Sequence, residues 1–134
     1  MKTLLLKLSL VSVLVLMIGS APAAADSTGY AFVFAYSLRS KTAYHSQIMT
    51  HPAKGQSLSE KEYCADIKLI RKMEDAFAKY LQTDRHLDVA QFSFSARTGY
   101  KTEAYALRQL EEDKADMRRQ GLEMELVSGF TFTP

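Results

Sequence analysis

The chain has 134 residues, of which 17 are basic, 15 are acidic and one is a cysteine. A single cysteine excludes an internal disulfide, and the near balance of charge lacks the basic excess typical of nucleic-acid-binding domains. The length fits one domain with a modest core.

The first 25 residues have the pattern of a secretory signal peptide. Two lysines precede an apolar run at 8–18, and three alanines at 23–25 suit cleavage before Asp26. The apolar run is shorter than the ~20 residues of a membrane-spanning helix, so we expect a cleaved signal and not an anchor. Residues 26–134 would then form one domain with equal numbers of both charges, exported to the bacterial periplasm or secreted.

The stretch 30–37 predicts a β-strand inside a sheet. Aromatic residues alternate there with smaller apolar ones, and a period of two places all four rings on one face: Tyr30, Phe32, Phe34 and Tyr36. The opposite face is apolar too, which suits a central strand. A short connection leads to a weaker alternating segment at 42–49, so we expect a β-hairpin with 42–49 at the edge.

A loop at 50–57 leads to a helix predicted over 59–81. Ser59 and Glu62 have the spacing of a capping box, in which each side chain bonds the other residue's backbone N–H. Apolar side chains then recur every three or four residues and form one stripe: Tyr63, Ile67, Ile70, Met73, Phe77 and Tyr80.

The rest of the chain predicts a strand, a helix and a last strand. The strand at 89–96 points Phe92 and Phe94 toward the core, and a loop at 97–101 follows. The helix begins near Thr102 and ends before Gly121, with this inner face: Ala104, Leu107, Leu110, Lys114 and Met117. The strand at 122–133 places these residues on one face: Leu122, Met124, Leu126, Phe130 and Phe132.

These elements predict an α+β fold with the order β-β-α-β-α-β. Each helix has one apolar stripe, so we expect a two-layer sandwich in which a four-stranded sheet carries both helices on one face. Six of the seven phenylalanines form three Phe-x-Phe pairs. We interpret these pairs as core and not as a stacking platform for RNA, because the helices need an apolar face to cover.

The standard catalytic motifs are missing from the sequence. It contains no Gly-x-Ser-x-Gly, His-Glu-x-x-His, phosphate-binding glycine loop or Cys-x-x-Cys. We expect no catalytic residue, no cofactor and no bound metal, since His45, His51 and His86 lack ligand-like spacing; a site of two histidines with Cys64 is the alternative. Cys64 is expected to lie in the second turn of the first helix, beside its apolar stripe, and either to pack there as a small apolar side chain or to pair between chains.

The loops provide the candidate binding site. If the second and third strands are parallel, the loops 50–57 and 97–101 meet at one edge of the sheet, beside helix N-termini that favour anions. The site would be a basic rim: His51, Lys54, Arg97, Tyr100 and Lys101. The simpler interpretation is that these five are ordinary solvated loop residues.

The leading functional hypothesis is a domain that binds another envelope or secreted protein. An inhibitor or immunity protein is one version of it, because Tyr and Arg are enriched among interface anchors. A small-anion-binding protein or an enzyme that uses the basic rim is the alternative. A polar sheet face around Gln91, Ser93 and Glu125 is the next candidate surface.

Overall fold

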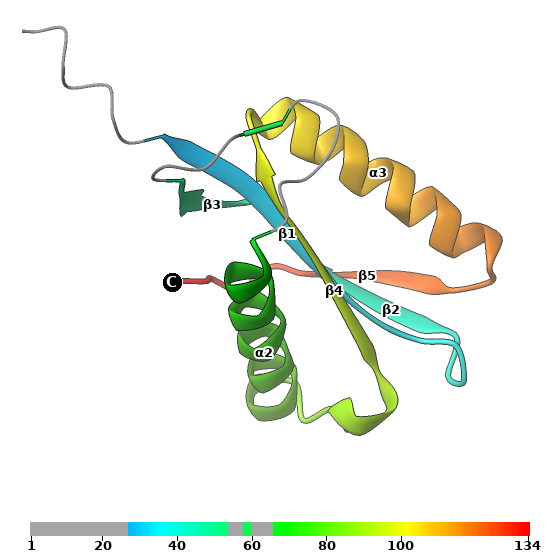
Figure 1. The fold of residues 1–134 in the computed structure, drawn as a ribbon. Helices are drawn as coiled ribbons and strands as arrows, with labels where there is room; N and C mark the ends of the chain where they lie inside the picture. Colours follow the sequence, from blue (N-terminus) through cyan, green and yellow to red (C-terminus); the bar gives the residue numbers. More distant parts are fainter. Residues whose placement is uncertain (1–26, 54–57, 60–65) are drawn as a thin grey trace, which may run out of the picture.

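The computed structural model describes residues 27–53, 58–59 and 66–134, so the predicted signal peptide lies outside the described residues. The elements follow one another as Figure 1 shows: β1 (Thr28–Ser37), β2 (Thr42–Ser46), β3 (Met49–Pro52), α2 (Ile67–Asp84), the 3-10 turn η2 (Val89–Gln91), β4 (Ser93–Tyr100), α3 (Glu103–Arg119) and β5 (Glu123–Val127). The α+β class is confirmed. Within these residues no helix combines the length and apolarity needed to cross a membrane.

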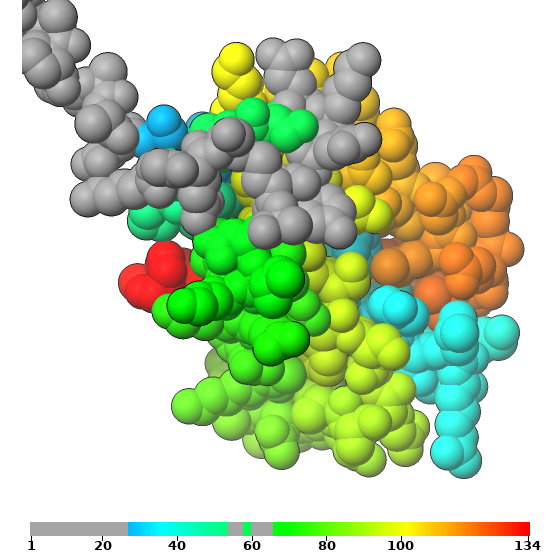
Figure 2. Space-filling view, viewed as in Figure 1, coloured from blue at the N-terminus to red at the C-terminus, as the bar shows by residue number. Residues whose placement is uncertain are grey.

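β1 is the central strand of the sheet. β2 and β3 pair antiparallel with its two halves on one side, and β4 pairs antiparallel with it on the other. β5 extends the sheet by pairing parallel with β2. β2 and β3 therefore share one strand position, and the positions run β4, β1, β2 with β3, then β5. Figure 2 shows β4 at the surface between α2 and α3.

The register shifts by one residue between β2 and β3. Phe34 pairs with His45, whereas Ala31 pairs with Met49. At the shift, the Val33 N–H donates to Ser46 Oγ at 3.0 Å. The serine hydroxyl thus replaces a backbone acceptor and keeps a buried amide satisfied.

The two helices cover opposite faces of the sheet, on either side of β1 in Figure 1. One cluster joins the small residues Ala31, Val33 and Ala35 of β1 to α2 through Met73, Phe77 and Leu81. The other joins Phe32, Phe34 and Tyr100 to α3 through Ala106 and Leu110. The expected placement of both helices on one face is therefore corrected. Because both faces of β1 are apolar, each face takes one helix.

α2 begins later than the sequence predicted. Its N-cap is Asp66, whose Oδ1 accepts the Leu69 N–H at 3.3 Å. Ser59 instead bridges to the end of β4: its N–H donates to the Gly99 carbonyl at 3.0 Å, and its carbonyl accepts the Lys101 N–H at 2.8 Å. The expected capping box of Ser59 with Glu62 involves a residue outside the described ranges. Glu62, Tyr63 and Cys64 lie outside the described residues.

The ends of α3 are as predicted. Thr102 Oγ1 accepts the Tyr105 N–H at 3.2 Å at the start. At the end, the Gly121 N–H donates to the Arg118 carbonyl at 2.9 Å and the Leu122 N–H donates to the Met117 carbonyl at 3.1 Å. This is a Schellman motif, and Gly121 has the left-handed φ of 83° that the motif requires.

The inner face of α3 is rotated from the predicted one. Ala106 and Leu110 are buried, whereas Ala104 is exposed and Leu107 is 47% exposed. The aromatic rings of β1 and β4 already fill the space below the start of α3, so the small Ala106 fits against them.

The predicted last strand is shorter than expected and changes face. β5 ends at Val127, and a turn brings Phe130 to the α2 side, with its ring 5.0 Å from that of Phe77. Met124 packs on the α3 side, so the two residues do not share a face. Gly129 in this turn leaves room for Tyr80, because a Cβ there would lie 2.3 Å from the Tyr80 hydroxyl oxygen. All six paired phenylalanines belong to the two clusters, which confirms the core assignment.

Candidate functional site

The two loops of the predicted rim are neighbours. β3 and β4 both run antiparallel to β1 and are therefore parallel to each other, as the prediction required. The segments touch directly, since the Gly99 N–H donates to His51 Nε2 at 3.0 Å.

The rim residues nevertheless do not gather at the surface. His51 is 2% exposed, and Tyr100 is fully buried with its ring stacked on Phe32 at a centroid distance of 6.0 Å. Arg97 turns toward α3, Lys101 is exposed, and Lys54 lies outside the described residues. Two of the five predicted residues are thus core residues, because β3 and β4 continue into the segments that the sequence assigned to loops.

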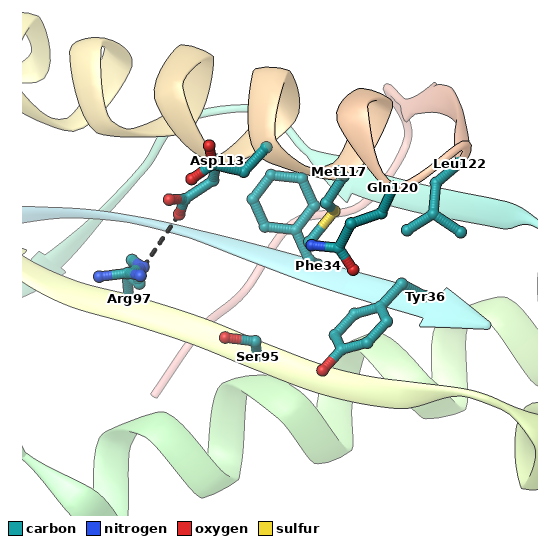
Figure 3. A pocket seen from close by; sticks show the side chains of 9 residues that line it. Phe34, Tyr36, Ser95, Arg97, Asp113, Met117, Gln120 and Leu122 are labelled. Atoms are coloured by element: carbon teal, nitrogen blue, oxygen red, sulfur yellow. Dashed lines mark ion pairs between the residues drawn. The ribbon is translucent and has the colours of Figure 1, made fainter. Parts of the chain in front are cut away.

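A groove lies instead between α3 and the sheet, and we call it the α3 groove (Figure 3). It has a volume of about 200 Å³ and is lined by Phe34, Tyr36, Ser95, Arg97, Asp113, Asp116, Met117, Gln120 and Leu122. Two local features leave it open. Ser95 is small where β4 passes under the helix, and the inner side of α3 carries the polar Asp113 between Leu110 and Met117.

Charges in the α3 groove are matched. The Asp113 side chain is 13% exposed, and its Oδ2 lies 2.9 Å from Arg97 Nε. Its Oδ1 accepts the Gln109 amide at 2.9 Å, so the carboxylate is held in one orientation. Asp116 pairs with Arg119 one turn further along α3. Each carboxylate of the groove therefore has an arginine, and the groove attracts neither sign of charge strongly.

Neutral polar groups occupy the rest of the α3 groove. Tyr36 and Gln120 border the end away from the Arg97–Asp113 ion pair, and Ser95 of β4 lies between Arg97 and Tyr36 (Figure 3). Hydroxyl and amide groups can each donate or accept hydrogen bonds. The arrangement suits an uncharged polar group, such as a peptide unit or a polar side chain, next to the apolar side chains of Phe34 and Met117.

The outer edge of β4 lies beside the groove. Because the Val33 N–H points toward Ser46, the backbone groups of Phe34 point the opposite way, toward their β4 partner Ser95. The adjacent residues Phe94 and Ala96 therefore direct their N–H and C=O groups outward. Along Phe94 and Ala96, no strand of the described residues lies on the outer side of β4.

The second candidate surface of the sequence analysis is divided between distant elements. Ser93 is on β4, Gln91 is in η2, and Glu125 is on β5 at the other edge, paired with Arg85 at 3.2 Å. None of these three residues lines the α3 groove, which the nearby Ser95 of β4 borders. Tyr36, Ser95 and Asp113 were not predicted as site residues from the sequence. The available signal was for Asp113, because a charged residue on the inner side of a helix is unusual.

The histidines do not form a site together. His45 is buried below α3, and its Nδ1 lies 2.9 Å from the Ser46 carbonyl. Burial lowers the pKa of His45 below its ordinary value of 6.5, and Lys114 and Arg118 act in the same direction. His86 is exposed after the end of α2. Across the described ranges, no three His, Cys, Asp or Glu side chains are grouped to hold a metal ion.

No protein-family model matches the chain, and no curated protein or solved structure matches it.

Proposed function

We propose that the chain is a small exported domain that binds another envelope or secreted protein by pairing with an extended segment of that protein along β4. The observation that carries this proposal is the outward-facing backbone of Phe94 and Ala96 beside the α3 groove. In strand addition, main-chain hydrogen bonds supply affinity, and pockets for alternate side chains supply specificity. The α3 groove would receive one such side chain.

The composition of this edge supports the proposal. Proteins usually protect an edge strand with lysine, proline or a bulge. The segment 93–96 reads Ser-Phe-Ser-Ala and contains neither lysine nor proline, and the bulge of β4 comes only after Arg97. The chain also pairs with this edge itself, since Ser59 forms a parallel bridge with Tyr100 at its far end. The edge therefore has the geometry and composition for pairing.

The alternative, an anion site or enzyme on the basic rim, has less support. Burial of His51 and Tyr100 leaves Arg97 and Lys101 as the rim residues that reach the surface in the described part. Arg97 is engaged with Asp113. Protein binding in the periplasm or outside the cell, as by an inhibitor or immunity protein, is therefore the function that we favour. The export itself rests on the signal-peptide pattern in 1–25.

Partner capture with edge variants tests the proposal. The processed protein is used to isolate partners from an envelope extract, and the purified partner is then titrated with wild type and variants. Ala96→Pro removes an outward N–H, which an edge strand tolerates. Thr131→Pro, in an exposed segment outside any strand, is the matched control. We expect affinity to fall about tenfold or more in Ala96→Pro at an unchanged melting temperature, and to stay unchanged in the control.

A second variant keeps the test decisive if Ala96→Pro does not fold. Ser95→Lys leaves the edge backbone intact and places a long charged side chain in the α3 groove. We expect it to fold and to weaken binding. A folded edge variant and a folded groove variant that both bind with unchanged affinity would contradict the proposal.

A further inference from the structure

His51 lies at the point where three strands meet. It pairs with Gly29 of β1 in the β3 register, and its ring passes over that glycine to reach β4. A Cβ at position 29 would lie 2.3 Å from His51 Cε1, so only glycine leaves room for the ring. The ring is almost fully buried there.

The hydrogen bonds of His51 require a neutral ring. The Gly99 N–H donates to Nε2 at 3.0 Å, so Nε2 must carry a lone pair. Nδ1 lies 3.0 Å from the Pro52 carbonyl and therefore carries the proton that it donates. A protonated ring would keep the bond to Pro52 but would present a second donor to the Gly99 N–H.

Gly99 belongs to a β-bulge that organises the end of β4. Tyr30 pairs with Tyr100 and Phe32 pairs with Arg97, so β4 has one residue more than β1 over this interval. Gly99 has a left-handed φ of 82°, and its carbonyl accepts the Ser59 N–H. His51 thus holds the bulge, and the bulge holds the Ser59 bridge.

We propose that His51 is a pH-sensitive latch on this end of β4. Protonation of Nε2 abolishes its acceptor, leaves a buried backbone N–H without a partner, and so loosens the bulge together with the Ser59 bridge. The inference does not rest on the proposed binding function. It concerns a histidine that the binding edge at Phe94 and Ala96 does not use.

Within the ranges that the structure describes, the charged groups around the latch come from α2 and from the end of β4. Asp66, Lys68 and Lys72 of the start of α2 line a hollow together with Pro52, next to His51 in β3. Lys101 follows the end of β4 and is exposed. On β1, the residue beneath the ring is Gly29, which has no side chain to titrate. Asp66 already accepts the Leu69 N–H, so a new acceptor for a protonated Nε2 would have to compete with a helix cap.

Hydrogen exchange tests the latch. In the processed, ¹⁵N-labelled protein, the exchange of the Gly99 amide is followed by NMR above and below the titration range of histidine, and ring ¹⁵N shifts report the state of His51. The Val33 amide is the internal control, because its acceptor is the Ser46 hydroxyl, which does not titrate. We expect protection of Gly99 to fall about tenfold more than protection of Val33 as His51 is protonated.

Two variants assign the effect. In His45→Gln, which removes the other buried histidine, the loss of Gly99 protection should persist. In His51→Gln, Gly99 protection should no longer depend on pH. Parallel changes at Gly99 and Val33, unchanged Gly99 protection across the range, or loss of the effect in His45→Gln would each overturn the proposal.

Discussion

Gly29→Ala is the substitution that probes the centre of the fold most sharply. The new Cβ would lie 2.3 Å from His51 Cε1 and 2.5 Å from Nε2, which is closer than a Cβ atom approaches a neighbouring side chain. The ring is buried and held at both nitrogens, so it cannot move aside without breaking its bond to Gly99. The stability lost in Gly29→Ala therefore comes from the clash with the His51 ring and not from the backbone conformation at position 29.

The magnitude follows from two contributions. Overpacking a filled site costs about 1–3 kcal/mol, and a buried backbone N–H without a partner costs about 1–3 kcal/mol. We expect Gly29→Ala to lower the free energy of unfolding by about 2–6 kcal/mol, a large share of the ~5–15 kcal/mol that a domain has. Urea denaturation measures it as a lower midpoint at an unchanged slope.

A double-mutant cycle with His51→Ala provides the control. Once the ring is absent, the methyl group at position 29 has room, and alanine in a strand is about 0.5–1 kcal/mol better than glycine. Gly29→Ala should then be neutral or stabilising, so the coupling energy should be at least as large as the cost of Gly29→Ala in the wild-type background. Additive effects, within about 0.5 kcal/mol, would refute the reasoning that the glycine exists to admit the ring.

Three further predictions concern the core and the charges under α3. Phe34→Ala should cost about 3–5 kcal/mol in urea denaturation; a variant as stable as wild type that loses its partner would instead make the ring a binding residue. Because burial lowers the pKa of His45, the unfolded state binds a proton more readily; stability should fall as pH drops below 6.5, and less steeply in His45→Gln. Arg97→Ala removes the ion-pair partner of the nearly buried Asp113 and should cost about 1–2 kcal/mol, against about 0–0.5 kcal/mol for the exposed control Arg119→Ala.

Patterns within one segment predicted the elements well. The alternation in 30–37 identified β1, and Thr102 and Gly121 identified both ends of α3, because cap and strand signals depend on neighbouring residues only. The same alternation separated the residues of β1 into two faces. It did not show that each face takes its own helix, since that depends on how the connections cross the sheet.

Contacts between distant segments explain the remaining differences. Ser59 and Asp66 are both good caps, but the backbone of Ser59 pairs with Gly99 and Lys101, some 40 positions away in the chain. His51 looked like a loop residue because nothing near it in sequence shows that Gly29 lies opposite. The α3 groove was missed for the same reason, because it exists only where Ser95 passes below Asp113.

Backbone exchange in the complex tests the central claim, that β4 binds a partner strand, most directly. Hydrogen exchange of the Phe94 and Ala96 amides is measured in the free protein and in the complex with the captured partner. The account predicts that both amides, which face outward in the free protein, gain about tenfold or more in protection, since each would donate to the added strand. Unchanged exchange at both amides, with protection gained around Lys101 instead, would contradict it.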